Sequence, residues 1–247
     1  MNITKITKKN GNKYELIIDN KKHIICDDVL LKYHILKPCE ISKETFEKLI
    51  KSNDETLVYT KIINYISFKM RSEREVRDKL YTLTTSGNLI EDILARLRSE
   101  GYLNNNKYLD SFISDRLSLT IYGPNRIKSD LIKKGFSEKE IDKSLDLIDS
   151  KAWEDKCNKI VAKMAKSLRN GSNRANIAKI RHNLINNGYE DKYFTKILGN
   201  LKLNEENNLK KEYEIIKKKL SSKYSGDTLE YKIKEKLYAK GYDISKI

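Results

Sequence analysis

Four residues near the N-terminus have side chains that could bind a metal ion. They are His23, Cys26, His34 and Cys39, and imidazole and thiolate groups are the usual zinc ligands. If residues 22–26 form a strand, His23 and Cys26 point to opposite faces because they are three positions apart. His34 and Cys39 lack the paired spacing of zinc ligands. The sequence therefore predicts no metal site and no cofactor.

Catalytic groups are equally hard to find. The phosphate-binding pattern G-x-x-x-x-G-K-[ST] does not occur, which argues against nucleotide binding. Cys157 lies between Trp153 and Ile160 on an apolar helical stripe, so we expect a buried thiol and not a nucleophile. The carboxylates alternate with Lys and Arg, as on solvated helix faces. We therefore expect a protein that binds and not an enzyme.

The charge of the chain indicates the chemistry of its partner. Its formal net charge is +15, and a strongly basic surface attracts polyanions, most commonly nucleic acid. Residues 151–204 hold twelve Lys and Arg against four Asp and Glu. This segment could meet DNA phosphates or an acidic strip of a protein. A generally basic composition without such a role is the other interpretation.

A repeat of 53 residues organises most of the chain. The stretches 126–136, 179–189 and 232–242 share four positions in register, which recur 53 residues apart. These positions are Ile127, Ile180 and Ile233; Leu131, Leu184 and Leu237; Gly135, Gly188 and Gly241; and Phe136, Tyr189 and Tyr242. A more divergent copy lies 51 residues upstream, with Val76 and Leu80 at the apolar positions and Thr84 in place of the glycine.

The shared residues describe the end of a helix. Ile and Leu four positions apart lie on one face, and the following Gly can adopt the left-handed conformation of a Schellman ending. Ser137 and Glu140 then form a capping box for the next helix. A longer amphipathic helix precedes each pair, so the unit is three helices. Such units bury little alone and stack on their neighbours, which predicts a mainly α, elongated and curved array.

The first 54 residues follow another pattern. Asn10-Gly11 and Asp19-Asn20 lie between apolar segments and predict a small β-rich module of hairpin-linked strands. Residues 42–51 predict a short helix capped by Ser42, with a junction at residues 52–54. The expected domains are the module 1–54, repeats at 55–103, 104–150 and 151–204, and a truncated repeat at 205–247.

Three stretches resemble signatures of the RecX family and cover about a quarter of the chain. SEREVRDKL (72–80) resembles S-E-x-E-L-R-x-K-L, and SEGYLNNNKY (99–108) resembles G-Y-L-D-D-x-R-F. YGPNRIKSDLIKKGF (122–136) resembles G-x-G-P-x-R-I-x-x-E-L-x-x-K-G-I/V. Asn104 and Asn105 replace the acidic pair of the second signature, so a salt bridge formed there is in doubt.

The resemblance implies a function in recombination and DNA repair. RecX-family proteins are expected to bind in the groove of the RecA filament on DNA and to inhibit its ATPase, recombinase and coprotease activities, which places this chain in homologous recombination, DNA repair and the SOS response. The alternative is a helical-repeat protein that binds DNA without RecA. The candidate contacts are Arg77, Arg98, Arg116, Arg126, Lys128, Lys133, Lys159, Lys163, Lys166, Arg169, Arg174, Lys179 and Arg181.

Further expectations concern the surroundings of the chain. No segment approaches the roughly 18 to 20 apolar residues of a membrane span, and the first residues, MNITKITKK, lack the apolar region of a secretion signal. Three cysteines without CxxC spacing are typical of a reducing compartment. We expect a monomer in the cytoplasm. Its expected partners are the RecA filament and, in addition, single- or double-stranded DNA. We expect no membrane partner and no small-molecule substrate.

Overall fold

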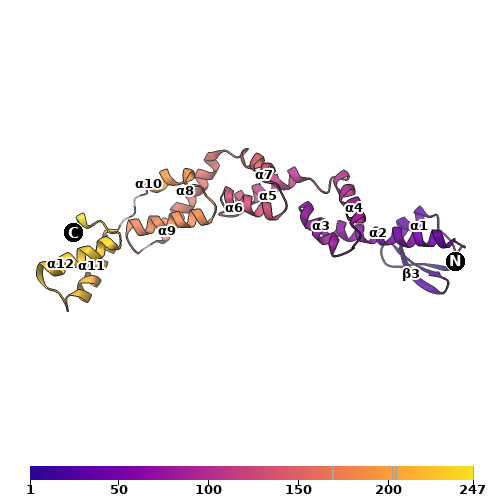
Figure 1. Ribbon diagram of the computed structural model, residues 1–247, viewed down its shortest axis with the longest axis horizontal. Coiled ribbons are helices and arrows are strands. Elements are labelled where there is room, and N and C mark those ends of the chain that lie inside the picture. Colours follow the sequence, from indigo (N-terminus) through magenta and orange to yellow (C-terminus); the bar gives the residue numbers. More distant parts are fainter. Residues whose placement is uncertain (169, 202, 204, 247) are drawn as a thin grey trace. The chain divides into compact units, whose positions relative to one another are not determined.

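The structure is mainly helical and has a small sheet at its N-terminal end (Figure 1). The computed structural model describes residues 1–168, 170–201, 203 and 205–246. The chain forms two compact units, Met1–Tyr108 and Leu109–Ile247, which are described one after the other. The expected class, a mainly α protein of three-helix repeats with a β-containing N-terminal module, is confirmed.

The N-terminal sheet contains β1 (Ile3–Lys8), β2 (Lys13–Ile18) and β3 (Lys21–Cys26), antiparallel and in that order. Gly11 lies in the first connection with a φ of 70°. Asp19 and Asn20 connect β2 to β3, with φ values of 45° and 65°. Two successive positive φ angles match the twist of a tight hairpin, which is why an Asp-Asn pair serves there. Both hairpins expected from the sequence are confirmed.

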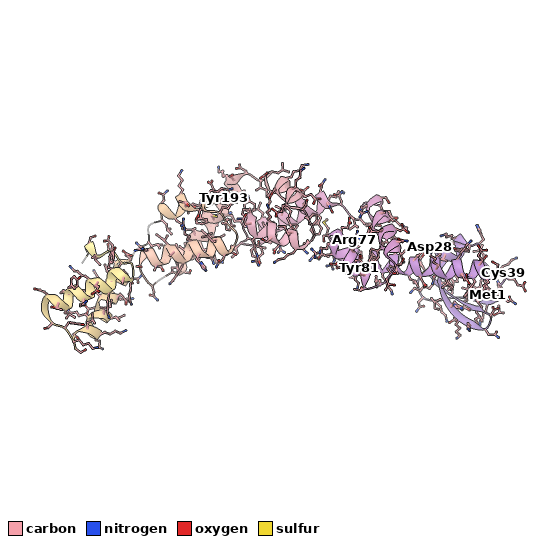
Figure 2. All side chains as sticks on the ribbon, in the orientation of Figure 1. Met1, Asp28, Cys39, Arg77, Tyr81 and Tyr193 are labelled. Carbon is pink, nitrogen blue, oxygen red and sulfur yellow. The ribbon has the colours of Figure 1, made fainter. Side chains whose placement is uncertain are left out.

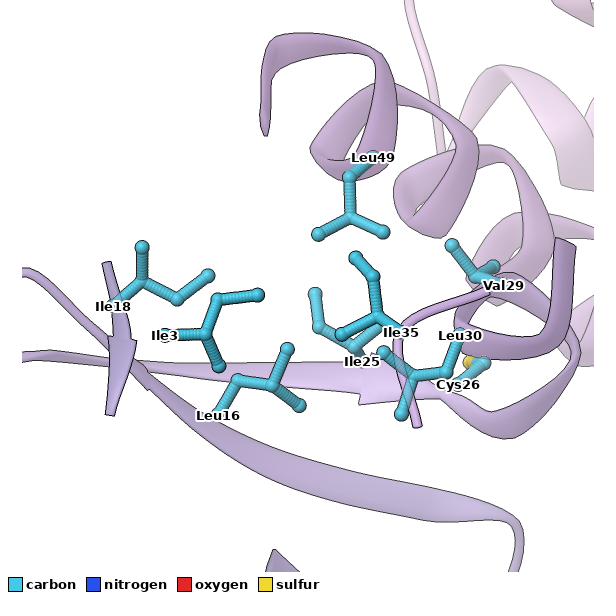
Figure 3. Close-up of a cluster of buried hydrophobic side chains, with 9 residues drawn as sticks. All are labelled: Ile3, Leu16, Ile18, Ile25, Cys26, Val29, Leu30, Ile35 and Leu49. Atoms are coloured by element: carbon cyan, nitrogen blue, oxygen red, sulfur yellow. The ribbon is translucent and has the colours of Figure 1, made fainter. Parts of the chain in front are cut away.

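One face of this sheet forms a core with two helices, α1 (Asp27–Lys32) and α2 (Lys43–Ser67). Ile3, Leu16, Ile18 and Ile25 come from the three strands and are buried against Leu49 of α2 (Figure 3). The remaining members come from β3, from α1 and from the segment that follows it: Cys26, Val29, Leu30 and Ile35. The module thus has a hydrophobic core of its own.

Helix α2 corrects the expected short helix and its junction at residues 52–54. It runs without a break for 25 residues, and Ser42 caps its N-terminus as predicted by accepting a hydrogen bond from Thr45 N–H. The polar segment that suggested a junction contains Asn53, whose side chain contacts the sheet. Asn53 Oδ1 accepts a hydrogen bond from Cys26 N–H (2.8 Å), and Asn53 Nδ2 donates one to Ile24 O (3.0 Å). A buried Asn inside a helix is tolerated when its amide has such partners.

The C-terminal half of α2 packs with α3 (Glu73–Tyr81) and α4 (Gly87–Ser99) as the first helical triplet. Val76 and Leu80 of α3 are fully buried, as the repeat alignment requires. Ser72 and Glu75 form a capping box at the start of α3. The first repeat therefore begins inside a helix that also belongs to the β-containing module.

Three sets of helices follow along the chain. The first set is α5 (Asn105–Leu119), α6 (Pro124–Lys133) and α7 (Glu138–Leu145). The next is α8 (Ser150–Ser167), α9 (Asn173–Asn186), η1 (Asp191–Tyr193) and α10 (Thr195–Gly199). The last is α11 (Glu206–Leu220), α12 (Gly226–Ala239) and η2 (Ile244–Lys246). The finer boundaries between repeats stay a prediction.

The expected Schellman endings are present in all three copies. Gly135, Gly188 and Gly241 have φ values of 93°, 85° and 80°. The N–H of each following aromatic residue donates to the carbonyl of the core leucine five positions earlier, as in Tyr189 N to Leu184 O (3.0 Å). A further Schellman ending, which the sequence analysis missed, closes α4 at Gly101. These endings fix where each second helix stops and how the chain leaves it.

In the second unit, the helix end at Gly188 packs on the beginning of α6. Gly123 N–H donates to Asn187 O (2.7 Å), and Asn125 N–H donates to Gly188 O (3.0 Å). The carbonyls at the end of α9 thus satisfy N–H groups at the start of α6. A similar contact joins α12 to α9, where Ser172 Oγ donates to Lys240 O (2.7 Å).

None of the helices in the described part of the chain combines the length and the apolar character that a membrane span needs.

Candidate functional site

The side chains that suggested a metal site have other surroundings in the structure. His23 packs edge-on against the ring of Phe46, with centroids 5.3 Å apart. Cys26 lies in the core of the module, where burial raises the pKa of its thiol. Among the residues that the structure describes, no three His, Cys, Asp or Glu side chains gather where they could hold a metal ion.

Cys157 is the buried core thiol that its position predicted. It is fully buried on α8, and burial raises the pKa of the thiol to about 12. Its neighbour Trp153, one turn earlier on the same stripe, is also buried. A thiol with so high a pKa stays protonated near neutral pH and is a poor nucleophile.

One cation of each second helix occupies the same repeat position. Arg77, Lys128 and Arg181 lie 51 and 53 residues apart, each three positions before a core leucine. In these three repeats, the cation pairs with a carboxylate in the segment that follows the second helix. Arg77 forms an ion pair with Glu91. Lys128 Nζ lies 2.8 Å from Asp142 Oδ1, and Arg181 Nη2 lies 3.0 Å from Asp191 Oδ1. These three candidates tie the parts of their own repeat together.

The first repeat extends this pairing into a network of four charges. Arg98 of α4 donates two hydrogen bonds to Glu73 of α3, at 2.8 and 2.6 Å. Arg77 of α3, labelled in Figure 2, forms ion pairs with both Glu73 and Glu91. Hydrogen bonding from Arg98 lowers the pKa of Glu73, so the carboxylate stays charged. The charges of Arg77 and Arg98 are therefore compensated within the fold.

Arg116 and Arg126 form a different arrangement around aromatic rings. The guanidinium of Arg116 lies 4.7 Å from the centre of the Phe112 ring and 5.8 Å from that of Tyr122. Arg126 lies 5.3 Å from the centre of the same Tyr122 ring. Neither arginine has an ion-pair partner within the described ranges. Stacking orients a guanidinium and leaves its N–H groups able to bind phosphate or carboxylate.

The lysines of α8 form the clearest uncompensated basic surface. Lys159, Lys163 and Lys166 are exposed, and their spacing places them on one face of the helix. No carboxylate among the described residues forms an ion pair with any of them. Lys159 and Lys163 also border a cavity of about 500 Å³ between α8 and the end of α5, which Leu117 and Ile121 line from the other side. We call Lys159, Lys163 and Lys166 the α8 lysine face.

Lys156 lies one turn before this face and has another role, which the sequence analysis missed. Its Nζ donates to the carbonyls of Leu117 (2.8 Å), Arg116 (3.0 Å) and Tyr122 (3.4 Å). An ammonium group is well placed at these carbonyls, because the C-terminal end of a helix carries partial negative charge. Burial lowers the pKa of Lys156 to about 8. Lys156 fixes α8 against the end of α5 and so positions the α8 lysine face.

The remaining candidates are spread over the second helices. Lys133 and Lys179 are exposed and form no ion pair within the part of the chain that is described. Arg174 is exposed at the start of α9 and packs its stem against Gly241. Arg169 lies outside the described residues. The structure therefore divides eleven of the thirteen candidates into paired cations, stacked arginines and exposed lysines without an ion pair among the described residues; Arg174 belongs to none of these groups, and Arg169 lies outside them because it is not described.

The comparisons with known proteins agree on one family. A family model described as RecX, first three-helix domain, matches residues 59–97. The chain is similar to Regulatory protein RecX of Streptococcus uberis, with 30% identity over 250 residues, 98% of this chain and 95% of that protein. It is 25% identical to Regulatory protein RecX of Oceanobacillus iheyensis over 260 residues, 99% of this chain and 95% of that protein.

A solved structure supports the fold. The crystal structure of a regulatory protein RecX superposes with a TM-score of 0.65 and 23% sequence identity. The match covers 78% of this chain and 97% of the other. The three-helix repeats are thus a shared architecture.

Proposed function

This chain belongs to the RecX family of regulatory proteins, and from that premise we propose that it binds the RecA filament on DNA and lowers its ATPase, recombinase and coprotease activities. It acts by binding and without a cofactor. Its proposed setting is the cytoplasm, as a monomer, in homologous recombination, DNA repair and the SOS response. The proposed division into repeats is 55–103, 104–150, 151–204 and 205–247, after a module of residues 1–54.

The α8 lysine face is the observation that carries this proposal. Other candidate cations, such as Arg77 and Lys128, are paired within their own repeat, whereas Lys159, Lys163 and Lys166 carry exposed charge. A filament of protein on DNA offers both phosphates and acidic side chains to such a surface. The stacked Arg116 and Arg126 add donors in the same unit.

The test is a titration of the full chain into RecA on single-stranded DNA, with ATP hydrolysis as the readout. We expect inhibition by the unaltered protein and a concentration for half inhibition at least about tenfold higher for Lys159→Glu, Lys163→Glu and Lys166→Glu combined, because charge reversal replaces attraction with repulsion. Helicity should not change, since the three side chains are exposed.

A matched control makes the same change of charge elsewhere. Lys61, Lys69 and Lys107 are exposed and form no ion pair among the described residues, and they are distant from α8 in sequence. Reversing these three should leave inhibition within about twofold. An unchanged ATPase rate at saturating unaltered protein would rule out RecA regulation.

A second candidate function is DNA binding without RecA. The α8 lysine face favours it as well, because Lys side chains neutralise phosphates irrespective of sequence. Mobility shifts over a salt series separate the two functions. Tight binding to DNA alone, with log affinity falling by roughly 0.9 per log unit of salt for each phosphate contacted, would favour the second candidate.

A further inference from the structure

An exposed apolar residue recurs once in every repeat. It directly follows the core leucine of the second helix, so the four positions are separated by the repeat lengths of 51, 53 and 53 residues. They are Tyr81 (60% exposed), Ile132 (40%), Ile185 (49%) and Tyr238 (64%). We call these four residues the repeat-end apolar positions.

The fold itself does not require apolar side chains there. The preceding leucines, such as Leu131 and Leu184, already fill the core and are fully buried. The exposed position three residues earlier is polar in every copy, with Asp78, Ser129, His182 and Glu235. Single exposed apolar residues are ordinary on protein surfaces. Recurrence at one position of four divergent copies is not, and it indicates a shared contact.

The backbone holds three of these side chains in a fixed setting. The carbonyls of Ile132, Ile185 and Tyr238 accept the N–H of the Schellman glycine, at 3.0, 2.9 and 2.8 Å. Each side chain therefore leaves the last turn of a helix whose end is well defined. The main chain at these three positions is already ordered, so binding there requires no further ordering of the backbone. Tyr81 is the last residue of α3, which ends without the glycine (Figure 2).

The residue types select the class of partner. Two of the four positions are isoleucine, and an aliphatic side chain offers no ring for stacking on a nucleic-acid base. An aliphatic or tyrosine side chain suits an apolar pocket on a protein. A partner that offers the same pocket at successive places, as a polymer of identical subunits does, matches a position that recurs once per repeat.

Lysines beside two of the repeat-end apolar positions indicate which charges the partner should carry around its pocket. Lys133 follows Ile132, and Lys236 precedes Tyr238 by two positions; both lysines are exposed and form no ion pair within the described ranges. A complementary surface therefore places carboxylates beside its apolar pocket.

We propose that the repeat-end apolar positions insert into equivalent apolar pockets on successive subunits of a protein filament, with carboxylates beside the pockets that receive Ile132 and Tyr238. This inference rests on the proposed function, and the filament is then that of RecA. The α8 lysine face supplies long-range attraction, and the apolar positions supply short-range contacts that set the register between repeat and subunit.

The test measures cosedimentation of the full chain with RecA filaments. Ile132→Ser and Ile185→Ser should each weaken binding about fivefold, and the double variant about 25-fold, as expected when separate interface residues contribute independently. The controls are Leu147→Ser and Leu36→Ser, which remove leucines that are 81% and 72% exposed but lie outside the repeat position. Both controls should bind as the unaltered chain does, and all five variants should keep its melting temperature.

The outcomes separate this inference from the proposed function. If the unaltered chain does not bind filaments, the proposed function fails, and this inference fails with it. If the unaltered chain binds and the double variant binds equally well, only the inference is overturned. It is also overturned if the double variant loses affinity for DNA without RecA, because the occupant would then be nucleic acid.

Discussion

Among single residues, Lys156 shows how one cation can set the geometry of a binding surface. Its ammonium group donates to two carbonyls in the last turn of α5 and to the carbonyl of Tyr122 just beyond it, and its helix then carries Lys159, Lys163 and Lys166. Lysine is ordinarily exposed, and nothing in the sequence around position 156 marks this lysine as different. Only the approach of α5 and α8 identifies its partners.

Replacing this cation tests its structural role. We expect Lys156→Met to lower the free energy of unfolding by about 1 to 3 kcal/mol, because the carbonyls of α5 lose a charged donor in a half-buried site. Lys159→Met, in the next turn, should change it by less than about 0.5 kcal/mol because Lys159 is exposed. Urea unfolding measures both. Equal effects would show that the contact of Lys156 with α5 contributes nothing to stability.

At the scale of elements, the Schellman glycines have two separate functions. The left-handed conformation ends each helix, and at Gly188 the missing side chain also lets α9 approach α6. A Cβ atom at Gly188 would lie 2.3 Å from Arg126 N, whereas a Cβ atom at Gly101 would meet nothing within 4 Å. The two glycines have similar φ values of 85° and 79°.

This difference gives a matched pair of substitutions. Gly101→Ala should cost about 1 to 2 kcal/mol, because alanine is strained in the left-handed region. Gly188→Ala should cost roughly twice as much or more, because α9 must also move away from α6. Thermal unfolding of the two variants provides the comparison. Similar losses of stability would mean that the packing of α9 on α6 is loose enough to absorb a methyl group.

For the whole molecule, the core is divided into separate clusters along the chain. One cluster joins the sheet to α1 and α2, another lies within the first triplet, and another joins α11 to α12. Repeat proteins of this kind are stabilised by contacts within a repeat and with the nearest neighbour. A destabilising substitution in one cluster should therefore lower the stability of that cluster and leave distant clusters unchanged.

Leu237, which is fully buried in the last cluster, allows a test of this division. Leu237→Ala should remove about 2 to 5 kcal/mol of local stability and speed amide exchange in α11 and α12. Exchange in β2 and β3 should stay as in the unaltered protein. The reciprocal variant, Leu16→Ala, should speed exchange in the sheet and in the parts of α1 and α2 that share its cluster, and should leave exchange in α11 and α12 unchanged. Equal acceleration in both regions after either substitution would indicate a single cooperative unit.

The sequence by itself determined the local architecture. The hairpin turns at Gly11 and Asp19-Asn20, the cap at Ser42 and the helix ends at Gly135, Gly188 and Gly241 all depend on residues only a few positions apart. Such features follow from backbone conformation and short-range hydrogen bonds, which a pattern of residue types describes well. The helical class and the three-helix repeats followed from the same local rules.

Only the tertiary structure decided what the polar side chains do. It turned the expected break at Asn53 into a contact with β3. It also showed that Arg77, Lys128 and Arg181 form ion pairs, whereas the α8 lysine face forms none with the residues that the structure describes. Those outcomes depend on which carboxylate or carbonyl lies within a few ångströms after folding. Partners such as Lys156 and Leu117, 39 residues apart, meet only because separate helices pack together.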